Sequence, residues 1–140
     1  MRRLARRLHD DYKLPVYVLV DNDPWGYYIY SVIKQGSINL AFESMRMAIP
    51  DAKFLGLSSR DPQTHRLPRN VGIKLNDKDI ARAKEIKGYP WFQKKEWQSE
   101  IDFMLKSGLK YELDALANKD FRYMTKEYLP RKLKDKDWLD

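Results

Sequence analysis

The sequence contains no cysteine and only two histidines, and this scarcity excludes several kinds of chemistry. Without cysteine there can be no disulfide framework, no thiolate nucleophile and no cysteine zinc site. The two histidines are far apart in the sequence and offer little for a transition metal. We therefore do not expect redox chemistry.

Long apolar runs are also missing. No hydrophobic stretch approaches the length that a bilayer requires, and the arginines after Met1 are not followed by the apolar segment of a secretory signal. We therefore expect a cytoplasmic protein with no membrane partner. With 140 residues, 43% of them hydrophobic, and no repeat or linker, we expect a single domain over 1–140.

Positive charge is in excess. The 27 Lys and Arg residues outnumber the 20 Asp and Glu residues and give a net charge of +7. This balance favours a polyanionic partner, although an excess of lysine is often only a solvated surface. The charge becomes a specific signal only if the basic residues share a face with a candidate site.

The most informative stretch runs from Val16 to Gly26. A short run of β-branched and aromatic residues ends in Asp21 and Asp23, and this pattern predicts a buried strand of a parallel sheet. Ligands of open α/β sheets bind beyond the carboxyl ends of the strands. Carboxylates two residues apart project to the same side of an extended chain, and Mg²⁺ is often held by one or two carboxylates.

A simpler interpretation of the same residues remains open. Asp23 directly precedes Pro24, and aspartate followed by proline is an ordinary start of a helix. Asp21 could then be only a turn residue. Capping and metal binding do not exclude each other.

Apolar periodicity predicts the other elements. Helices are expected over 2–12, 24–35, 37–48, 77–87 and 93–106, and strands over 54–57 and 71–75. Two further amphipathic pieces are expected over 109–116 and 121–128, with Pro130 as a terminator and a frayed or interfacial tail over 131–140. The opening helix resembles the crossover of a βαβ unit, so we expect a fragment whose first strand precedes Met1.

The polar segment over 58–70 follows the second strand and contains Arg60, Arg66 and Arg69. Long loops without regular structure are usually functional or disordered. Because this segment leaves the same edge of the sheet as Asp21 and Asp23, we expect a functional loop that faces DNA or a dimer partner.

Three stretches resemble a known family. VYVLVDNDPWGYYIYSVIKQGS, FLGLSSRD and NDKDIARAKEI are similar to the C-terminal Toprim domain of the A subunit of archaeal type IIB DNA topoisomerase, topoisomerase VI. The resemblance extends over essentially the whole chain, and the DNDPWG motif is its most specific part. It implies an α/β fold with a small Toprim-like parallel sheet flanked by helices, here without its first strand, and a helical C-terminal half.

The resemblance also implies a divided site. The family binds Mg²⁺ through an acidic triad, of which Asp21 and Asp23 match the DxD pair. The third acid, a glutamate, and the nucleophilic tyrosine both lie upstream in the family. The chain is therefore expected to be a partial Toprim domain that carries metal ligands but no catalytic nucleophile, and to be inactive when isolated.

For the intact enzyme, the resemblance implies ATP-dependent relaxation and decatenation of double-stranded DNA. The expected partners are the ATPase B subunit together with a second A subunit, in a heterotetramer. Arg60, Arg66 and Arg69 are the candidates for contacts with DNA phosphates.

Two other functions compete with this one. A haloacid-dehalogenase-like phosphatase also has a strand that ends in DxD, but its motif needs Thr or Val where this sequence has Trp25. The second alternative is a non-catalytic nucleic-acid-binding or dimerisation module whose aspartates only cap a helix.

Overall fold

The computed structural model describes residues 2–35 and 48–140. In chain order its elements are α1 (Arg2–Tyr12), β1 (Tyr17–Leu19), α2 (Pro24–Gln35), β2 (Lys53–Gly56), α4 (Asp61–Thr64), the 3-10 helix η2 (Arg69–Val71), β3 (Ile73–Lys74), α5 (Asp77–Lys87), the 3-10 helix η3 (Pro90–Gln93), α6 (Lys95–Ser107), β4 (Leu109–Lys110), α7 (Asp114–Ala117), the π-helical turn η4 (Met124–Tyr128) and α8 (Leu129–Lys134). The helix expected over 37–48 falls almost entirely outside the described residues. No helix in the described ranges combines the length and apolarity needed to cross a membrane.

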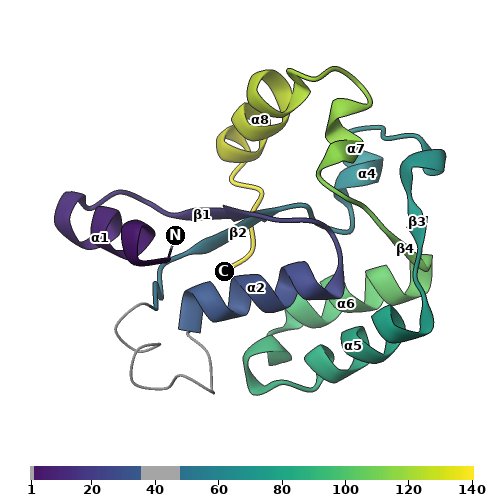
Figure 1. Ribbon diagram of the computed structural model, residues 1–140, viewed down its shortest axis with the longest axis horizontal. Coiled ribbons are helices and arrows are strands. Elements are labelled where there is room, and N and C mark those ends of the chain that lie inside the picture. Colours follow the sequence, from purple (N-terminus) through teal and green to yellow (C-terminus); the bar gives the residue numbers. More distant parts are fainter. Residues whose placement is uncertain (1, 36–47) are drawn as a thin grey trace.

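The parallel pair β1 and β2 forms the centre of the molecule (Figure 1). Val18 is paired with Phe54, and the register shifts by one residue directly after Val18. Pairing continues beyond the strands, because the Val20 amide donates to the Gly56 carbonyl at 2.8 Å. The two strands expected before Asp21 and over 54–57 are confirmed, and their carboxyl ends meet at one edge of the sheet.

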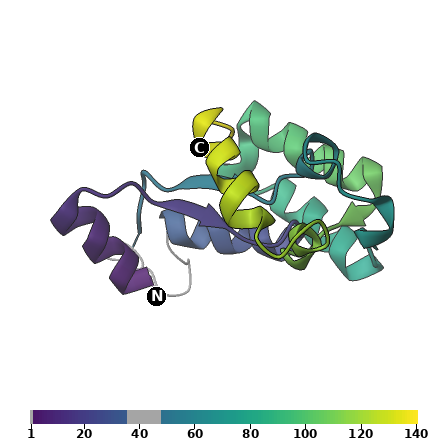
Figure 2. The same cartoon turned by 90° about the horizontal axis from the view of Figure 1, so that it is seen from above.

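Helices cover both faces of this pair. In Figure 1, α2, α5 and α6 lie below the strands, whereas α7 and α8 lie above them. Figure 2 shows the same molecule from above, with α1 extending from one end in both views. The arrangement agrees with the expected α/β fold and helical C-terminal half.

An aromatic cluster fills the core between the sheet and the lower helices. Trp97 of α6 is fully buried at its centre, with the ring centroids of Tyr27, Tyr30, Phe54 and Phe92 at 5.1–5.6 Å from its own. Aromatic pairs of this kind each add about 0.5–1.5 kcal/mol beyond burial. Tyr27 and Tyr30 of α2, which join this cluster, are therefore packing residues.

The segment over 131–140 is not frayed, which corrects one of the two alternatives expected for it; a role in an interface stays a prediction. Leu139 forms an antiparallel bridge with Phe54, with backbone hydrogen bonds of 2.7 and 2.9 Å, so the last residues extend the sheet on the β2 side. The ring of Trp138 lies 5.3 Å from that of Tyr17. These contacts join residues that are distant in sequence, and local charge and periodicity do not reveal them.

Pro130 does not end a helix, which corrects a second expectation. It stands at the start of α8, directly after the π-helical turn over Met124–Tyr128. A proline has no N–H and its ring crowds the carbonyl four residues earlier, so it fits where the helical hydrogen-bond pattern changes. The chain therefore continues as helix through Pro130.

Three further predictions need correction. The segment over 58–70 is not structureless, since it contains α4 and the start of η2. The strand expected over 71–75 is only Ile73–Lys74, and both of these residues are exposed. Leu109 lies in β4 rather than in a helix, because Gly108 ends α6 with a φ of 70° and turns the chain toward β3.

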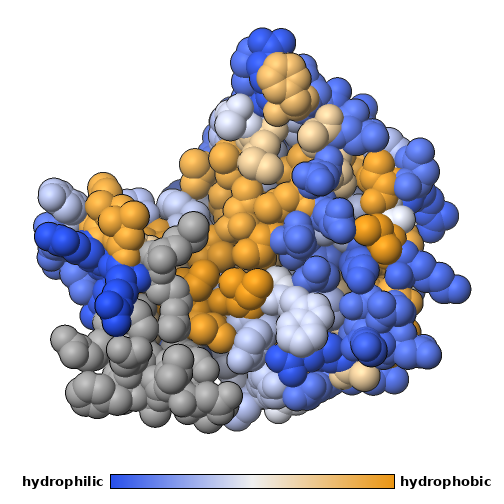
Figure 3. Space-filling view, in the orientation of Figure 1, coloured by the Kyte–Doolittle hydropathy of each residue, from blue (hydrophilic) through white to orange (hydrophobic). Residues whose placement is uncertain are grey.

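An apolar groove lies beside β1 on the face shown in Figure 3, where hydrophobic side chains gather in the middle of the molecule. Its lining comes from α1, β1 and α2 and consists of Ala5, Val16, Tyr17, Val18, Leu19, Val20, Tyr28, Ile29, Val32 and Ile33. Within the described ranges, β1 pairs with β2 alone. The first strand that the sequence led us to expect concerns chain before Met1 and stays a prediction.

Candidate metal centre

Asp21 and Asp23 lie in the turn between β1 and α2, at the carboxyl edge of the sheet. Asp21 Oδ1 accepts a hydrogen bond from the backbone amide of Leu113 at 2.7 Å. Asp23 Oδ1 accepts one from the backbone amide of Gly26 at 2.6 Å. Each carboxylate is thus fixed through one oxygen, and within the described part of the chain the second oxygen of each has no hydrogen-bond partner.

The contact between Asp23 and Gly26 is a helix cap. The Asp23 carbonyl also accepts the first backbone hydrogen bond of α2, from Tyr27 at 3.3 Å, and Pro24 is the first helical residue. The capping role expected for Asp23 is therefore confirmed. It uses only one carboxylate oxygen, so it leaves the metal-binding interpretation open.

The segment after β4 forms the second wall of the centre. Tyr111 pairs with Asn22 through two backbone hydrogen bonds of 2.8 and 3.0 Å, and the amide of Leu113 donates to Asp21, 92 residues earlier in the sequence. The turn is therefore held by a distant part of the chain. Sequence reasoning missed this wall, because a two-residue strand carries little periodic signal.

Asn22, between the two aspartates, points into the protein. It is 1% exposed, and its Nδ2 donates to the Leu57 carbonyl at 3.1 Å and to the Tyr27 hydroxyl at 3.0 Å. The Tyr27 hydroxyl in turn donates to Glu100 at 2.8 Å, and the Ser59 amide donates to the same oxygen at 2.5 Å. A buried polar network therefore connects the turn to β2 and α6.

This network shifts the pKa values of its members. Burial raises the pKa of the Glu100 carboxyl, although the hydrogen bonds from Ser59 and Tyr27 act to lower it. Burial also raises the pKa of the Tyr27 hydroxyl well above its usual value, and the neighbouring Glu100 adds to this effect. Tyr27 is therefore a neutral hydrogen-bonding group and a poor candidate for a nucleophile.

The charges around Asp23 are close enough to affect its ionisation. Burial raises the pKa of the Asp23 carboxyl, the Gly26 amide lowers it, and the negative charge of Asp21 raises it again. A bound cation would relieve both the burial of charge and the repulsion between the carboxylates. The electrostatics thus fit a cation site.

The carboxylate oxygens of Asp21 and Asp23 are ligands of the kind that Mg²⁺ binds. Two carboxylates with free oxygens can supply part of an octahedron, which waters and substrate phosphates commonly complete. Within residues 2–35 and 48–140 no group of three or more His, Asp or Glu side chains is arranged to hold a metal. The two aspartates are therefore candidate ligands of an incomplete site.

The three candidate arginines are exposed on the loop after β2. Arg60 donates to the Ser99 hydroxyl at 3.4 Å and lies 5.7 Å from the ring centre of Phe103, whereas Arg66 has a positive φ of 54° and Arg69 begins η2. The loop leaves the sheet at the expected edge. Within the described ranges, none of the three forms a hydrogen bond or ion pair with Asp21 or Asp23.

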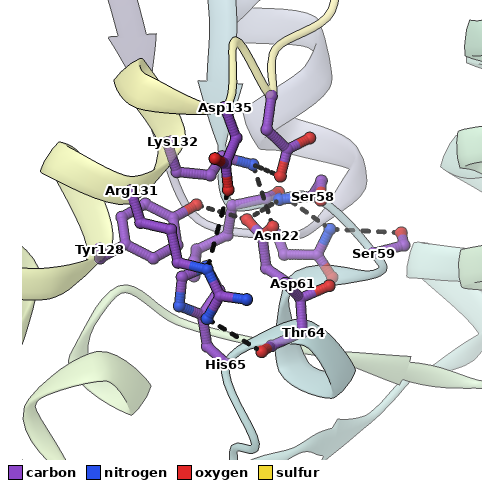
Figure 4. A network of polar contacts seen from close by, with 12 residues as sticks. Asn22, Ser58, Ser59, Asp61, Thr64, His65, Tyr128, Arg131, Lys132 and Asp135 are labelled. Carbon is purple, nitrogen blue, oxygen red and sulfur yellow. Dashed lines mark hydrogen bonds and ion pairs between the residues drawn. The ribbon is translucent and has the colours of Figure 1, made fainter.

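Asp61 anchors the same loop from inside, as Figure 4 shows. Its carboxylate accepts hydrogen bonds from the Ser58 amide at 2.9 Å, from the Tyr128 hydroxyl and from the Lys132 ammonium at 2.9 Å. Asp61 and Lys132 are 1% and 2% exposed, so this ion pair is buried. Since Asp61 is fully engaged in joining α8 to the loop, it is not available as a metal ligand.

The comparison with protein families decides the family of this chain. The family described as the Toprim domain of the topoisomerase 6 A subunit/Spo11 group matches residues 1–133. The chain belongs to this family. Its Toprim fold confirms the resemblance carried by the DNDPWG motif and sets aside the haloacid-dehalogenase-like phosphatase.

Relatives from archaea and plants support the assignment to the Toprim family. The chain is 47% identical over 148 residues to the A subunit of type 2 DNA topoisomerase 6 from Sulfurisphaera tokodaii, and 46% identical over 148 residues to that from Hyperthermus butylicus. It is 34% identical to the A subunit of DNA topoisomerase 6 from Arabidopsis thaliana. These alignments cover 99% of the chain but only 38%, 38% and 33% of the respective relatives. The chain thus spans about a third of the length of these relatives.

Proposed function

We propose that this chain is the Toprim portion of the A subunit of an ATP-dependent type IIB DNA topoisomerase, which cleaves and rejoins double-stranded DNA to relax supercoils and decatenate duplexes. One observation carries the proposal. Asp21 and Asp23 stand at the carboxyl edge of the sheet with one oxygen each fixed by a backbone amide and the other unengaged among the described residues. The membership of the Toprim family supports it.

In this proposal, Asp21 and Asp23 hold Mg²⁺ through their free oxygens. The ion would supply electrostatic stabilisation of charge that develops on a DNA phosphate and on the leaving 3′-oxygen. The residues of this chain keep the two carboxylates in place: Tyr111 and Leu113 hold one side of the turn, and Asn22 holds the other. A further glutamate ligand is expected from chain outside residues 1–140.

The nucleophile is expected outside the chain as well. A tyrosine oxygen attacks a DNA phosphorus, the bond from phosphorus to the 3′-oxygen breaks, and a 5′-phosphotyrosyl link and a 3′-hydroxyl result. Two A subunits would cut the two strands, and the ATPase B subunit would drive passage of a second duplex. We propose that Arg60, Arg66 and Arg69 contact the DNA backbone, since they are exposed on the loop at the same edge of the sheet.

The test replaces each metal ligand with its amide. Asp21→Asn and Asp23→Asn keep the shape of the side chain and its bond to a backbone amide but remove the charge. Each is placed in a complete A subunit that is paired with its B subunit. Each should abolish Mg²⁺-dependent relaxation of supercoiled DNA while the circular dichroism spectrum stays unchanged.

Asp135→Asn is the matched control, because Asp135 is exposed at the C-terminal end of α8 and its ion pair with Arg131 is long, at 3.9 Å. It should relax DNA as the parent enzyme does. Normal relaxation by both Asp21→Asn and Asp23→Asn would refute the metal assignment and favour a non-catalytic nucleic-acid-binding or dimerisation module.

A further inference from the structure

A lysine that sequence reasoning did not single out lies beside the Asp21/Asp23 turn. Lys110 is the last residue of β4 and directly precedes Tyr111, whose backbone pairs with Asn22. Its Nζ donates to Asp79 Oδ2 at 2.8 Å, and its side chain is 22% exposed. The ammonium is thus localised by one partner and still accessible to a ligand.

Asp79 is arranged to hold this ammonium in place. It is the third residue of α5, where it forms a capping box with Asn76: the Asn76 amide donates to Asp79 Oδ2 at 3.0 Å, and the Asp79 amide donates to Asn76 Oδ1 at 2.8 Å. Although burial acts to raise it, the pKa of Asp79 is lowered by the hydrogen bonds from Lys110 and Asn76. Asp79 is therefore a charged and rigid partner.

The charge of Lys110 acts on the candidate metal ligands. Tyr111, the residue directly after Lys110, exchanges two backbone hydrogen bonds of 2.8 and 3.0 Å with Asn22, which stands between the two aspartates, so Lys110 and both carboxylates belong to the same turn region. An ammonium has three donors, and within the described residues Asp79 is the hydrogen-bond partner of Lys110. Two N–H donors of the ammonium therefore remain for water or for a ligand bound beside Asp21 and Asp23.

We propose that Lys110 is a phosphate-binding residue of this centre, whose ammonium, positioned by Asp79, contacts a non-bridging oxygen of a DNA phosphate held at the Asp21/Asp23 site. The inference rests on the proposed function and adds a residue to it. Lysine binds phosphate as a point charge and needs no bidentate geometry, so a single localised ammonium is sufficient. Lys110 is the binding residue, and Asp79 is a positioning residue.

The role has two consequences of opposite sign. The positive charge of Lys110 opposes binding of a cation at Asp21 and Asp23, and the same charge favours a phosphate. Removing it should therefore strengthen metal binding and weaken DNA binding. A purely structural residue would weaken both, because its loss would disturb the turn.

The experiment uses a complete A subunit that contains this chain, and two probes. The first probe is Mn²⁺, whose binding is measured by electron paramagnetic resonance, and the second is a short DNA duplex in Mg²⁺ at several salt concentrations. For Lys110→Met we expect the dissociation constant for Mn²⁺ to fall about threefold or more. The duplex should bind more weakly, and the slope of log K against log salt should decrease by about one. For Asp79→Asn we expect weaker Mn²⁺ binding, since the negative charge is lost.

Two control variants make the result specific. Lys84→Met removes an exposed lysine from α5 and should leave Mn²⁺ binding unchanged. Lys110→Arg retains the positive charge, so the salt dependence of duplex binding should stay close to that of the parent. It also serves as the second variant if Lys110→Met does not fold.

Each outcome decides the inference. If Mn²⁺ binding requires Asp21 and Asp23 but Lys110→Met changes neither Mn²⁺ affinity nor the salt slope, the inference is wrong and the proposed function stands. If Lys110→Met loses both Mn²⁺ and duplex binding, Lys110 is only structural and the inference is also wrong. If Asp21→Asn and Asp23→Asn bind Mn²⁺ as the parent chain does, the proposed metal site fails and the inference fails with it.

Discussion

Gly26 offers a sharp test of how the turn with the two aspartates is built. It is the third residue of α2 and packs against the backbone of the preceding turn. A Cβ placed on Gly26 would lie 2.2 Å from the carbonyl oxygen of Asp21 and 3.1 Å from Cγ2 of Val20. The absence of a side chain at Gly26 therefore lets α2 approach the backbone of Asp21.

Two effects of Gly26→Ala oppose each other. Alanine in place of glycine ordinarily stabilises a helix by about 1 kcal/mol. The overlap, however, is with backbone, and a Cβ contact below 3.0 Å is essentially never seen, so the Asp21 carbonyl has to move by about 0.8 Å (3.0 − 2.2). Overpacking of this kind costs about 1–3 kcal/mol. Allowing for the gain in helix propensity, we expect a net loss of up to about 2 kcal/mol in the free energy of unfolding.

Gly26→Ala should also displace the carboxylates of Asp21 and Asp23 and so weaken the binding of Mn²⁺. Displacements of this size at a site weaken function by about tenfold or more. Denaturant unfolding followed by circular dichroism gives the stability, and Mn²⁺ titration gives the affinity. Gly88→Ala is the matched control: its Cβ would meet only the Glu85 carbonyl oxygen at 3.4 Å, and its φ is −82°. Parent-like stability and Mn²⁺ affinity in Gly26→Ala would refute the reasoning.

Two other predictions concern charge. Because the pKa of Glu100 is raised in the folded protein, its contribution to stability is fully present below the unfolded value of 4.5 and is lost as pH rises through the folded value. Glu100→Gln should therefore gain stability relative to the parent as pH rises above 4.5, and a difference independent of pH in denaturant unfolding would contradict this. Arg66→Gln and Arg69→Gln should each reduce the salt slope of duplex binding by about one, whereas Arg122→Gln should not. If the salt slope of duplex binding is unchanged in both variants, Arg66 and Arg69 do not contact DNA.

The sequence predicted the local parts of the candidate centre. The apolar run before Asp21 predicted β1, and the Asp-Pro pair predicted the start of α2. The periodicity over 77–87 likewise predicted α5, which Asn76 and Gly88 cap at its two ends. These signals are readable because capping and strand formation depend on residues within one or two turns of each other.

The remaining parts of the centre depend on contacts between distant segments. Lys110 reaches Asp79 only because β4 pairs with β3 and the next residue, Tyr111, pairs with Asn22. Glu100 is joined to Asn22 through the Tyr27 hydroxyl only because α6 packs under the sheet. The periodicity around Lys110 suggested an amphipathic helix and carried no sign of this contact. Such pairings gain their energy from burial and charge across the whole chain, and not from neighbouring residues.

The sequence by itself determined the family, the principal helices and strands, and the two aspartates at the end of β1. The tertiary structure decided which oxygen of each aspartate is engaged, which lysine stands beside them, and that the charged C-terminal segment packs against β2 instead of fraying. The physical reason is the distance along the sequence over which each effect acts. Propensity, capping and periodicity act over a few residues, whereas the burial of Lys132 against Asp61 joins positions 71 residues apart.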